Sequence, residues 1–339
     1  MGTQATLADV ATLAGVSLAT ASRALSPTKG SAVGPELRAR VRAAAAELSY
    51  APNAHAQAMR SPTASSAGLI VHDIADPVAA AIASGVLAAA ADQNLIVTIG
   101  ASGGDAEAEV RLVETLRRQR ARGIILAGSR FADSSAQRWL ADEVSAIRAG
   151  GGRVVTIGQH TPGTHAVVVD DRAGADGLAR ALWARGYRRF AVLAGPEFLI
   201  TSEDRVGGFR DAVTALGGEL PEEQVLASQM SRDGGYTSLR DLLDHGVEVD
   251  CVFAVDDSMA MGAVAALRDS GLRVPDDVAV AGFGDIAALR DVVPGLTTVR
   301  LPLAQMGRTA LQLAFDSRDE AQLRHVTGTV VLRDSTPAR

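Results

Sequence analysis

Hydrophobic positions in the first fifty residues repeat with the spacing of three short helices. The apolar stripes comprise Val10, Ala11 and Ala14, then Ala21 and Leu25, then Leu37, Val41, Ala45 and Leu48. Gly15 lies where the first helix must end in a left-handed residue, and Ser17 can cap the second helix by accepting a bond from its first free amides. Val16 fills the gap between them. We therefore predict a three-helix core with a helix-turn-helix at its start.

From Ala67 onward the pattern changes to short apolar runs that alternate with longer stretches of helical spacing, such as Ala106 to Arg120 and Arg172 to Arg185. The runs are GLIV, LIVTIG, RGIILAG, RVVTIG, HAVVVDD, RFAVLAG, DCVFAVDD and DVAVAGFG. Such alternation is typical of parallel strands joined by crossover helices. There are more alternations than one ordinary sheet holds. We expect an α/β body of two lobes, each a doubly wound parallel sheet.

Composition fits a folded chain with an uneven charge distribution. Hydrophobic residues make up 47% and charged residues 21%, which excludes wholesale disorder, and no apolar run is long enough to span a bilayer. The start, MGTQATLADV, lacks the pattern of a secretion signal, so we expect a cytoplasmic protein associated with the nucleoid. Residues 1–62 carry six basic and three acidic side chains, a net +3, which leaves −9 for the remainder of a chain whose net charge is −6. This division suits a small DNA reader attached to an acidic body.

The sequence gives no sign of a catalytic, metal or cofactor site. Cys251 is the single cysteine and lies within an apolar run, and the six histidines are scattered singly. The stretch IGASGGD lacks the glycine spacing of a nucleotide-binding loop. No nucleophile, base and orienting group occur together. Ligands of open α/β sheets bind beyond the carboxyl ends of the strands, so the candidate contacts are Asp73 to Ala79, Gly158 to His160, Gly195 to Arg205, Asp256 to Ser258 and Gly282 to Asp285.

The second predicted helix has the chemistry of a DNA reader. It would present Leu18, Ala19 and Thr20, and one turn later Arg23, to the floor of a major groove. Leu18 and Ala19 can make only apolar contacts, so Arg23, which can bond a guanine edge with two donors, would carry most of the hydrogen-bonded readout. The alternative for these twenty residues alone is an ordinary helical hairpin.

The segments TLADVATLAGVS, TASRAL and YAPNAHAQAMR resemble the N-terminal module of the lac/gal repressor family of bacterial transcription regulators. The body resembles the same family at VDDRAGA, at Arg205 to Phe209, and at AVDDSMAMGA, GLRVPDDVAVAGFGD and PGLTTVRLPLAQMG. The resemblance implies a helix-turn-helix head at 1–51, a hinge helix and linker at 52–66, and a periplasmic-binding-protein-like effector and dimerisation domain at 67–339. Lobe one would comprise about 67–166 plus 297–326, and lobe two about 167–296 plus 327–339.

By this resemblance the protein is a repressor that binds a pseudo-palindromic operator as a homodimer. The predicted DNA contacts are Thr6, Ser17, Leu18, Ala19, Thr20, Ser22, Arg23, Asn53, Ala56, Met59 and Arg60. The segment Asn53 to Arg60 is too short for a stable isolated helix and should order only on DNA, with Met59 as the wedge in the minor groove. The alternative is a plain linker. The end DSTPAR has no heptad pattern, which favours a dimer over a tetramer.

The resemblance also implies a small-molecule effector, a sugar or sugar derivative, held between the lobes. The predicted contacts are Asp76, Val78, Thr201, Arg205, Met230, Asp256 and Asp285. The alternatives are a salt bridge from Arg205 to Glu203 or Asp204, a turn role for Thr201 or Asp256, and core packing for Met230.

The chain departs from the family pattern at the ligand site. Val78-Ala79 stands where aromatic residues are common, and Gly158 and Gly284 stand where aspartates are usual. Asp285 could substitute for the second aspartate. We hypothesise that the loss of two acids leaves Arg205 less neutralised and favours an anionic effector, a sugar acid or phosphate.

Two other classes of function remain open at this point. A solute-binding receptor would share the body, but the first sixty residues contradict it. An enzyme that uses the cleft would need a catalytic group that we do not find. The sequence indicates neither the operator nor the effector, nor whether the effector releases DNA or promotes its binding.

Overall fold

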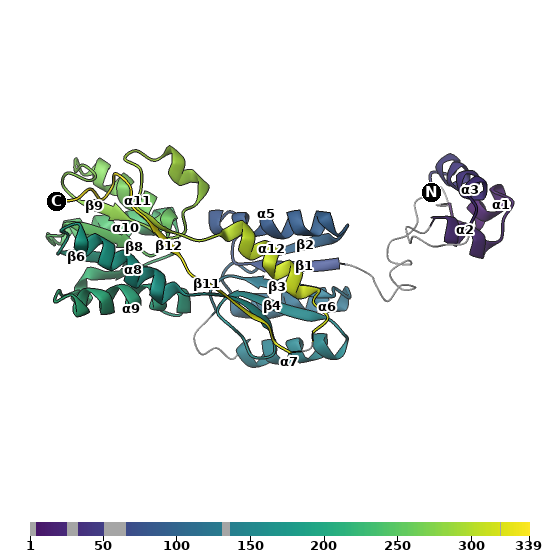
Figure 1. The fold of residues 1–339 in the computed structure, drawn as a ribbon, viewed down its shortest axis with the longest axis horizontal. Helices are drawn as coiled ribbons and strands as arrows, with labels where there is room; N and C mark the ends of the chain where they lie inside the picture. Colours follow the sequence, from purple (N-terminus) through teal and green to yellow (C-terminus); the bar gives the residue numbers. More distant parts are fainter. Residues whose placement is uncertain (1–4, 26–32, 51–65, 131–135, 319) are drawn as a thin grey trace. The chain divides into compact units, whose positions relative to one another are not determined.

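The computed structural model describes residues 5–25, 33–50, 66–130, 136–318 and 320–339. The chain divides into two units, Met1–Ala64 and Ser65–Arg339. The first is helical, and the second is built of two α/β lobes (Figure 1). None of the helices in the described ranges combines the length and apolar character that a bilayer crossing needs.

The first unit, the head, contains three helices: α1 (Leu7–Leu13), α2 (Leu18–Leu25) and α3 (Pro35–Glu47). Thr6 and Asp9 form a capping box at the start of α1. Gly15 has a φ of +60°, the left-handed conformation expected at the end of α1. The amide of Thr20 donates to the Ser17 hydroxyl at 3.1 Å, which confirms the predicted cap of α2. The core is packed mainly from alanines around the fully buried Val10 and Val41.

Lobe one is built on a six-stranded parallel sheet with the order β11-β5-β4-β3-β1-β2. Its strands are β1 (Ser66–Val71), β2 (Ile96–Ala101), β3 (Gly123–Ala127), β4 (Arg153–Gly158), β5 (His165–Val169) and β11 (Leu323–Val326), and its helices are α5 (Pro77–Asp92), α6 (Ala106–Arg118), α7 (Ala136–Ala149) and α12 (Leu303–Ala314). Leu69 and Ile125 pack toward α5 and α12, whereas Ile70 and Ile124 pack toward α6 and α7. Because both faces are covered, its central strands read as continuous apolar runs.

Lobe two is built on a four-stranded parallel sheet with the order β7-β6-β8-β9. Its strands are β6 (Phe190–Ala194), β7 (Val225–Ala227), β8 (Cys251–Ala254) and β9 (Ala279–Ala281), with α8 (Asp171–Ala184), α9 (Ile200–Ala215), α10 (Arg232–Asp244), α11 (Asp257–Asp269) and the 3-10 turns Glu222–Gln224 and Ala287–Asp291. Helices α8 and α9 pack together on one side of the sheet, and α10 and α11 on the other (Figure 1). Phe190, Phe209 and Phe253 contact one another in the core.

The chain passes between the lobes three times, and two of these crossings lie a few residues beyond the expected boundaries. Strand β5 continues in the lobe-one sheet as far as Val169, so the first crossing follows that residue. Thr297 and Arg300 bridge to Ala281 and Gly284, so the second crossing comes only before α12. Strand β10 (Thr298–Arg300) pairs antiparallel with β12 (Thr329–Val331), which follows the third crossing. The C-terminal segment, yellow in Figure 1, thus contributes to both lobes.

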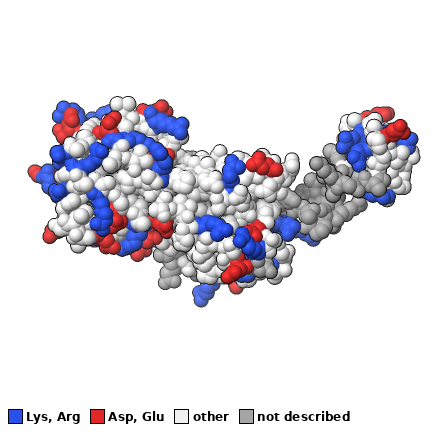
Figure 2. Space-filling model, viewed as in Figure 1, with Lys and Arg blue, Asp and Glu red and all other residues white. Residues whose placement is uncertain are grey.

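Charged side chains are unevenly spread over the second unit. On the face shown in Figure 2, acidic and basic side chains gather on the lobe that carries β6, and uncharged surface predominates where the two lobes meet. The electrostatics of the region between the lobes therefore depend on the residues that line its interior.

Candidate functional site

The head exposes the start of α2, where the sequence predicts DNA contacts. Leu18 is 52% exposed, and Ser17, Ala19 and Arg23 are exposed beside it. The Arg23 side chain is held against its own helix by a bond of 3.1 Å from its Nε to the Ala19 carbonyl oxygen. These residues form one continuous face with Thr20 and Ser22, which are half-buried. Thr6 is exposed too, but its hydroxyl already takes part in the cap of α1.

The predicted hinge contacts lie outside the described residues. Asn53, Ala56, Met59 and Arg60 all fall within the range 51–65. Their role on DNA stays a prediction.

A cavity of about 1070 Å³ lies between the two lobes. Its walls are made by residues that follow the carboxyl ends of strands from both sheets, as open α/β folds favour. The structure brings together there six of the seven predicted effector residues: Asp76, Val78, Thr201, Arg205, Met230 and Asp256. Because both lobes supply walls, a molecule in this cavity would contact both at once.

Arg205 is buried in the lobe-two wall, and two of its three guanidinium nitrogens have hydrogen-bond partners there. Its Nε donates to Asp171 Oδ1 at 2.8 Å, its Nη1 donates to the Val255 carbonyl oxygen at 2.7 Å, and its guanidinium lies 3.9 Å from the centre of the Phe283 ring. The predicted alternative partners, Glu203 and Asp204, were wrong, because the carboxylate that pairs with Arg205 comes from the start of α8.

Asp171 is thus a site residue that the sequence reasoning missed. Its side chain is 2% exposed. Burial raises the pKa of the Asp171 carboxyl, and the neighbouring Arg205 opposes that effect. The signal in the sequence was its place two residues after strand HAVVV, within the family-like stretch VDDRAGA.

This ion pair overturns the premise for an anionic effector. We expected Arg205 to be left without a neutralising acid, because Gly158 and Gly284 replace two aspartates. Instead Asp171 neutralises it from within the lobe. The two glycines have φ values of +115° and +134°, a conformation that disfavours a side chain at either position.

Asp76 and Asp256 enter the cavity from opposite lobes, each at the start of a helix. The Asp76 carboxylate caps α5 by accepting from the Val78 amide at 2.9 Å, and Asp256 caps α11 by accepting from the Ser258 amide at 2.7 Å. Burial raises the pKa of both carboxyls. For Asp256 the negative charges of Asp76 and Asp257 add to this effect, and its pKa reaches about 7.

Thr201 belongs to a set of hydrogen bonds that joins the lobes beside the cavity. Its hydroxyl accepts from Gln159 Nε2 at 2.9 Å, and its amide donates to the Ser129 hydroxyl at 3.0 Å. The amide of Ile200 donates to the Arg130 carbonyl oxygen at 3.2 Å. Gln159 lies within the predicted range Gly158 to His160, whereas Ser129, which follows β3, was not predicted as a site residue. Together these bonds connect the start of α9 to lobe one.

Met230 and Val78 supply apolar wall. Met230 packs so closely against Gly195 that a Cβ at that position would lie 2.5 Å from its Cγ. Val78 is half-buried at the start of α5. Both arrangements fit a wall that contacts a ligand, and both residues also pack against the core.

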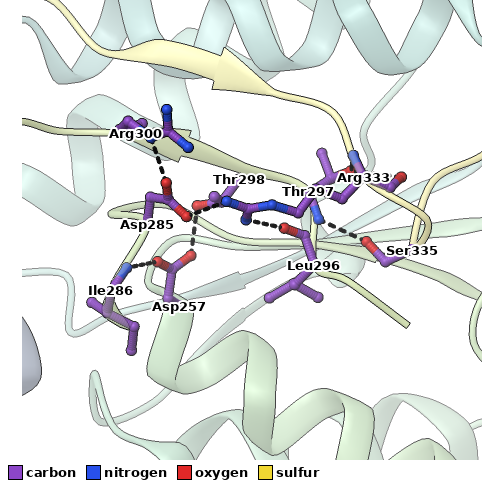
Figure 3. Close-up of polar contacts among 9 residues, drawn as sticks. All are labelled: Asp257, Asp285, Ile286, Leu296, Thr297, Thr298, Arg300, Arg333 and Ser335. Carbon is purple, nitrogen blue, oxygen red and sulfur yellow. Dashed lines mark hydrogen bonds and ion pairs between the residues drawn. The ribbon is translucent and has the colours of Figure 1, made fainter. Parts of the chain in front are cut away.

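The prediction that Asp285 takes part in the ligand site was wrong. Its carboxylate lies between two arginines, accepting from Arg300 Nε at 2.5 Å and from Arg333 Nη2 at 2.6 Å (Figure 3). It is not among the described residues that line the cavity. Asp285 is held away from the cavity by the C-terminal segment, because Arg333 follows β12, which returns to lobe two after the third crossing.

Family models match both parts of the chain. Residues 6–53 match the bacterial regulatory proteins of the lacI family, and residues 179–336 match a periplasmic binding protein-like domain. The HTH-type transcriptional regulator GalR of Escherichia coli (strain K12) is 32% identical over 98% of this chain and 95% of its own length. The HTH-type transcriptional regulator CelR of Thermobifida fusca is 33% identical, over 92% of this chain and 91% of its own length.

Solved structures agree with these matches. A lac repressor dimer bound to operator and an anti-inducer covers 99% of this chain and 100% of its own, with a TM-score of 0.85 at 26% identity. A CelR–cellobiose complex covers 98% of this chain and 99% of its own, with a TM-score of 0.71 at 30% identity. These likenesses confirm the predicted fold and indicate a regulator of transcription rather than an enzyme. The chain belongs to the lacI family of bacterial regulatory proteins.

Proposed function

We propose that this regulator is a repressor that binds a pseudo-palindromic operator as a homodimer, and that a sugar bound between its lobes controls that binding. The proposed parts are a DNA-reading head at 1–51, a hinge at 52–66 and an effector and dimerisation domain at 67–339. The proposed site of action is the nucleoid in the cytoplasm.

The observation that carries the proposal is the cavity shared by the two lobes in a chain that also has a lacI-type head. A ligand shifts a conformational equilibrium only through unequal affinity for the two states. A ligand in this cavity would bind the two states unequally, because the cavity walls come from both lobes. Lobe one supplies Asp76 and Val78, and lobe two supplies Arg205, Met230 and Asp256. A ligand that contacts both walls therefore favours the lobe arrangement that it bridges.

The start of α2 supports the DNA-binding part. Leu18 and Ala19 are exposed and lie beside Arg23. An exposed leucine does not stabilise the fold of an isolated head. Apolar side chains at these positions can contact thymine methyl groups, and the arginine can read a guanine. The solved relatives include a lac repressor dimer on its operator, which is the arrangement that we propose for this chain.

The DNA-binding part is tested by selecting bound DNA from a random pool with the full-length protein. We expect a two-fold symmetric site. Replacing Arg23 by Ala should lower affinity for that site by roughly 1 to 3 kcal/mol and leave nonspecific DNA nearly unaffected. Arg42→Ala, at an exposed position of α3, is the matched control and should not change the preference for the selected site. Equal losses on both DNAs for Arg23→Ala would show that this arginine contacts only phosphate.

The effector part is tested by adding sugars to the complex with the selected operator. We expect one class of sugar to change operator affinity, and the direction of the change tells an inducer from a co-repressor. The change should be lost in Arg205→Lys, because a lysine cannot reproduce the fork that bonds Asp171 and Val255. If no sugar changes operator affinity, sugar control is refuted while sequence-specific DNA binding stands.

A further inference from the structure

The described lining of the interlobe cavity contains more acidic than basic side chains. It has four aspartates and two arginines: Asp73, Asp76, Asp171, Asp256, Arg205 and Arg232. Of these, Asp171 and Arg205 neutralise each other. The two carboxylates left in the interior, Asp76 and Asp256, come from opposite lobes.

The other cationic groups at the cavity do not offset these two carboxylates. Arg232 is 53% exposed and pairs with Asp233 at 2.8 Å, so its charge is both solvated and partnered. His72 also lines the cavity, and burial, together with the positive charge of Arg130, lowers its pKa and favours the neutral form. The interior is therefore negative once Asp76 and Asp256 are ionised, which for Asp256, with a pKa of about 7, requires a pH above neutral.

Helix N-termini commonly attract anions, and the N-termini of α5, α9, α10 and α11 at the cavity already have acceptors. The starts of α5 and α11 are capped by Asp76 and Asp256 themselves. The first amides of α9 donate to lobe one, through the Ser129 hydroxyl and the Arg130 carbonyl oxygen. Helix α10 is capped by the Ser231 hydroxyl, which accepts from Gly234 at 3.1 Å. An anion at any of these four N-termini would have to displace one of these acceptors.

We propose that the cavity selects neutral or amino sugars and rejects sugar acids and sugar phosphates, with Asp76 and Asp256 as the residues that set this preference. The identity of the ligand as a sugar rests on the proposed function, whereas the charge preference rests on the cavity alone. Carboxylates accept hydrogen bonds from hydroxyl and ammonium groups, and the low dielectric of a buried site increases their repulsion of a second anion.

The charge preference can be measured without knowing the effector. The only cysteine, Cys251, is fully buried, so Val78→Cys places a single accessible thiol in the cavity beside Asp76. Its reaction rates with methanethiosulfonates that carry an ammonium or a sulfonate group are compared at pH 8, where Asp256, with a pKa of about 7, is ionised. The ratio of the two rates cancels any effect of the site on the thiol itself. Ser145→Cys, exposed on α7, is the reference position.

We expect the ratio of cationic to anionic rates to be about tenfold higher at position 78 than at position 145. Adding Asp256→Asn to Val78→Cys should bring the rate ratio at position 78 several-fold closer to the ratio at position 145. Asparagine is chosen because it keeps the side-chain oxygen that caps α11. Asp269→Asn, at the other end of the same helix, should leave the ratio unchanged. If the double variant fails to fold, the same ratio is measured with Asp76→Asn at the start of α5, and Asp92→Asn at the end of α5 is its control. An equal or lower ratio at position 78, or no response to either cavity substitution, overturns the proposal.

Sugars of one configuration and different charge provide the second test. The full-length protein is titrated with a hexose, its 2-amino derivative, its uronic acid and its 6-phosphate at constant ionic strength, and the shift in unfolding temperature is recorded. We expect the neutral or amino sugar to bind at least tenfold more tightly than the acid and the phosphate. Tighter binding of the acid or phosphate overturns the proposal. If none of the four binds, control by this sugar is refuted, and the reagent ratio still decides the charge preference.

Discussion

Asp256 and Asp285 follow neighbouring strands of lobe two, β8 and β9, yet their surroundings give them opposite properties. Asp285 lies between Arg300 and Arg333; burial alone would raise its pKa, but the bonds and charges of the two arginines outweigh it and the pKa is lowered. Asp256 is buried beside Asp76 and Asp257, and its pKa is raised to about 7. The difference shows that neighbours from other parts of the chain decide whether a carboxylate after a strand is held in ion pairs or lines the cavity.

The largest expected effect comes from breaking the buried ion pair beside Asp256. Arg205→Ala leaves the Asp171 carboxylate buried without its partner and removes the contact with Phe283. We expect the free energy of unfolding to fall by about 3 to 5 kcal/mol, measured by urea titration. Arg300→Ala is the matched control beside Asp285, because this arginine is 56% exposed and Arg333 remains. A loss as large in the control would contradict the contrast between the two regions.

The second prediction concerns the raised pKa of Asp256. A carboxyl whose pKa is higher in the folded state contributes stability that is complete below its unfolded pKa near 4 and is lost as pH rises to about 7. Asp256→Asn stays neutral, so its stability relative to wild type should increase between pH 4 and pH 7, by up to about 4 kcal/mol. Unfolding temperatures of both proteins across this range give the measurement. A constant difference at all pH values would refute the assignment.

The third prediction concerns Asp257, which joins the two regions. Its carboxylate accepts from the Thr298 hydroxyl at 2.6 Å and from the Ile286 amide at 2.9 Å (Figure 3). Asp257→Ala leaves both buried donors without this acceptor, and we expect a loss of about 2 kcal/mol in unfolding free energy. Asp269→Ala, at the exposed end of α11, should change it by less than about 0.5 kcal/mol. Similar losses for both variants would show that helix propensity, not the buried bonds, is responsible.

The smallest expected effect has the opposite pH dependence to that of Asp256. A carboxyl with a lowered pKa contributes stability that is present above its unfolded pKa and lost as pH falls. Asp285→Asn should therefore cost about 1 kcal/mol at pH 7, because the arginines around it are partly exposed, and the cost should shrink toward pH 3. Unfolding temperatures at the two pH values test this. A cost that grows on acidification would contradict the structural role of Asp285.

The strands that are buried on both faces could be predicted from the sequence, whereas the exposed strand β11 could not. Strands β3, β6 and β8 are buried on both faces, and that burial requires the unbroken apolar runs that identify them. Strand β11 has mostly exposed residues, and it pairs with β5, from which the whole of lobe two separates it in sequence. No local pattern encodes such a pairing.

The candidate site shows the same limit. The position of Asp76 and Asp256 at helix starts after strands could be predicted, because caps and strand ends have local signatures. The pairing of Arg205 with Asp171, 34 residues earlier, and of Asp285 with Arg333, 48 residues later, could not. The pairing of Arg205 with Asp171 is what removes the reason to expect an anionic effector.

The last residues of the chain complete lobe two from the outside. The Ser335 hydroxyl accepts from the Thr297 amide at 2.8 Å and donates to the Val280 carbonyl oxygen at 2.7 Å, and the Arg339 amide donates to Arg185 at 2.8 Å. During synthesis the head, whose core ends at Tyr50, emerges first. Lobe two can form these bonds only after residues 335–339 have been synthesised. The lobe that supplies Arg205 and Asp256 to the cavity is thus completed later than the head.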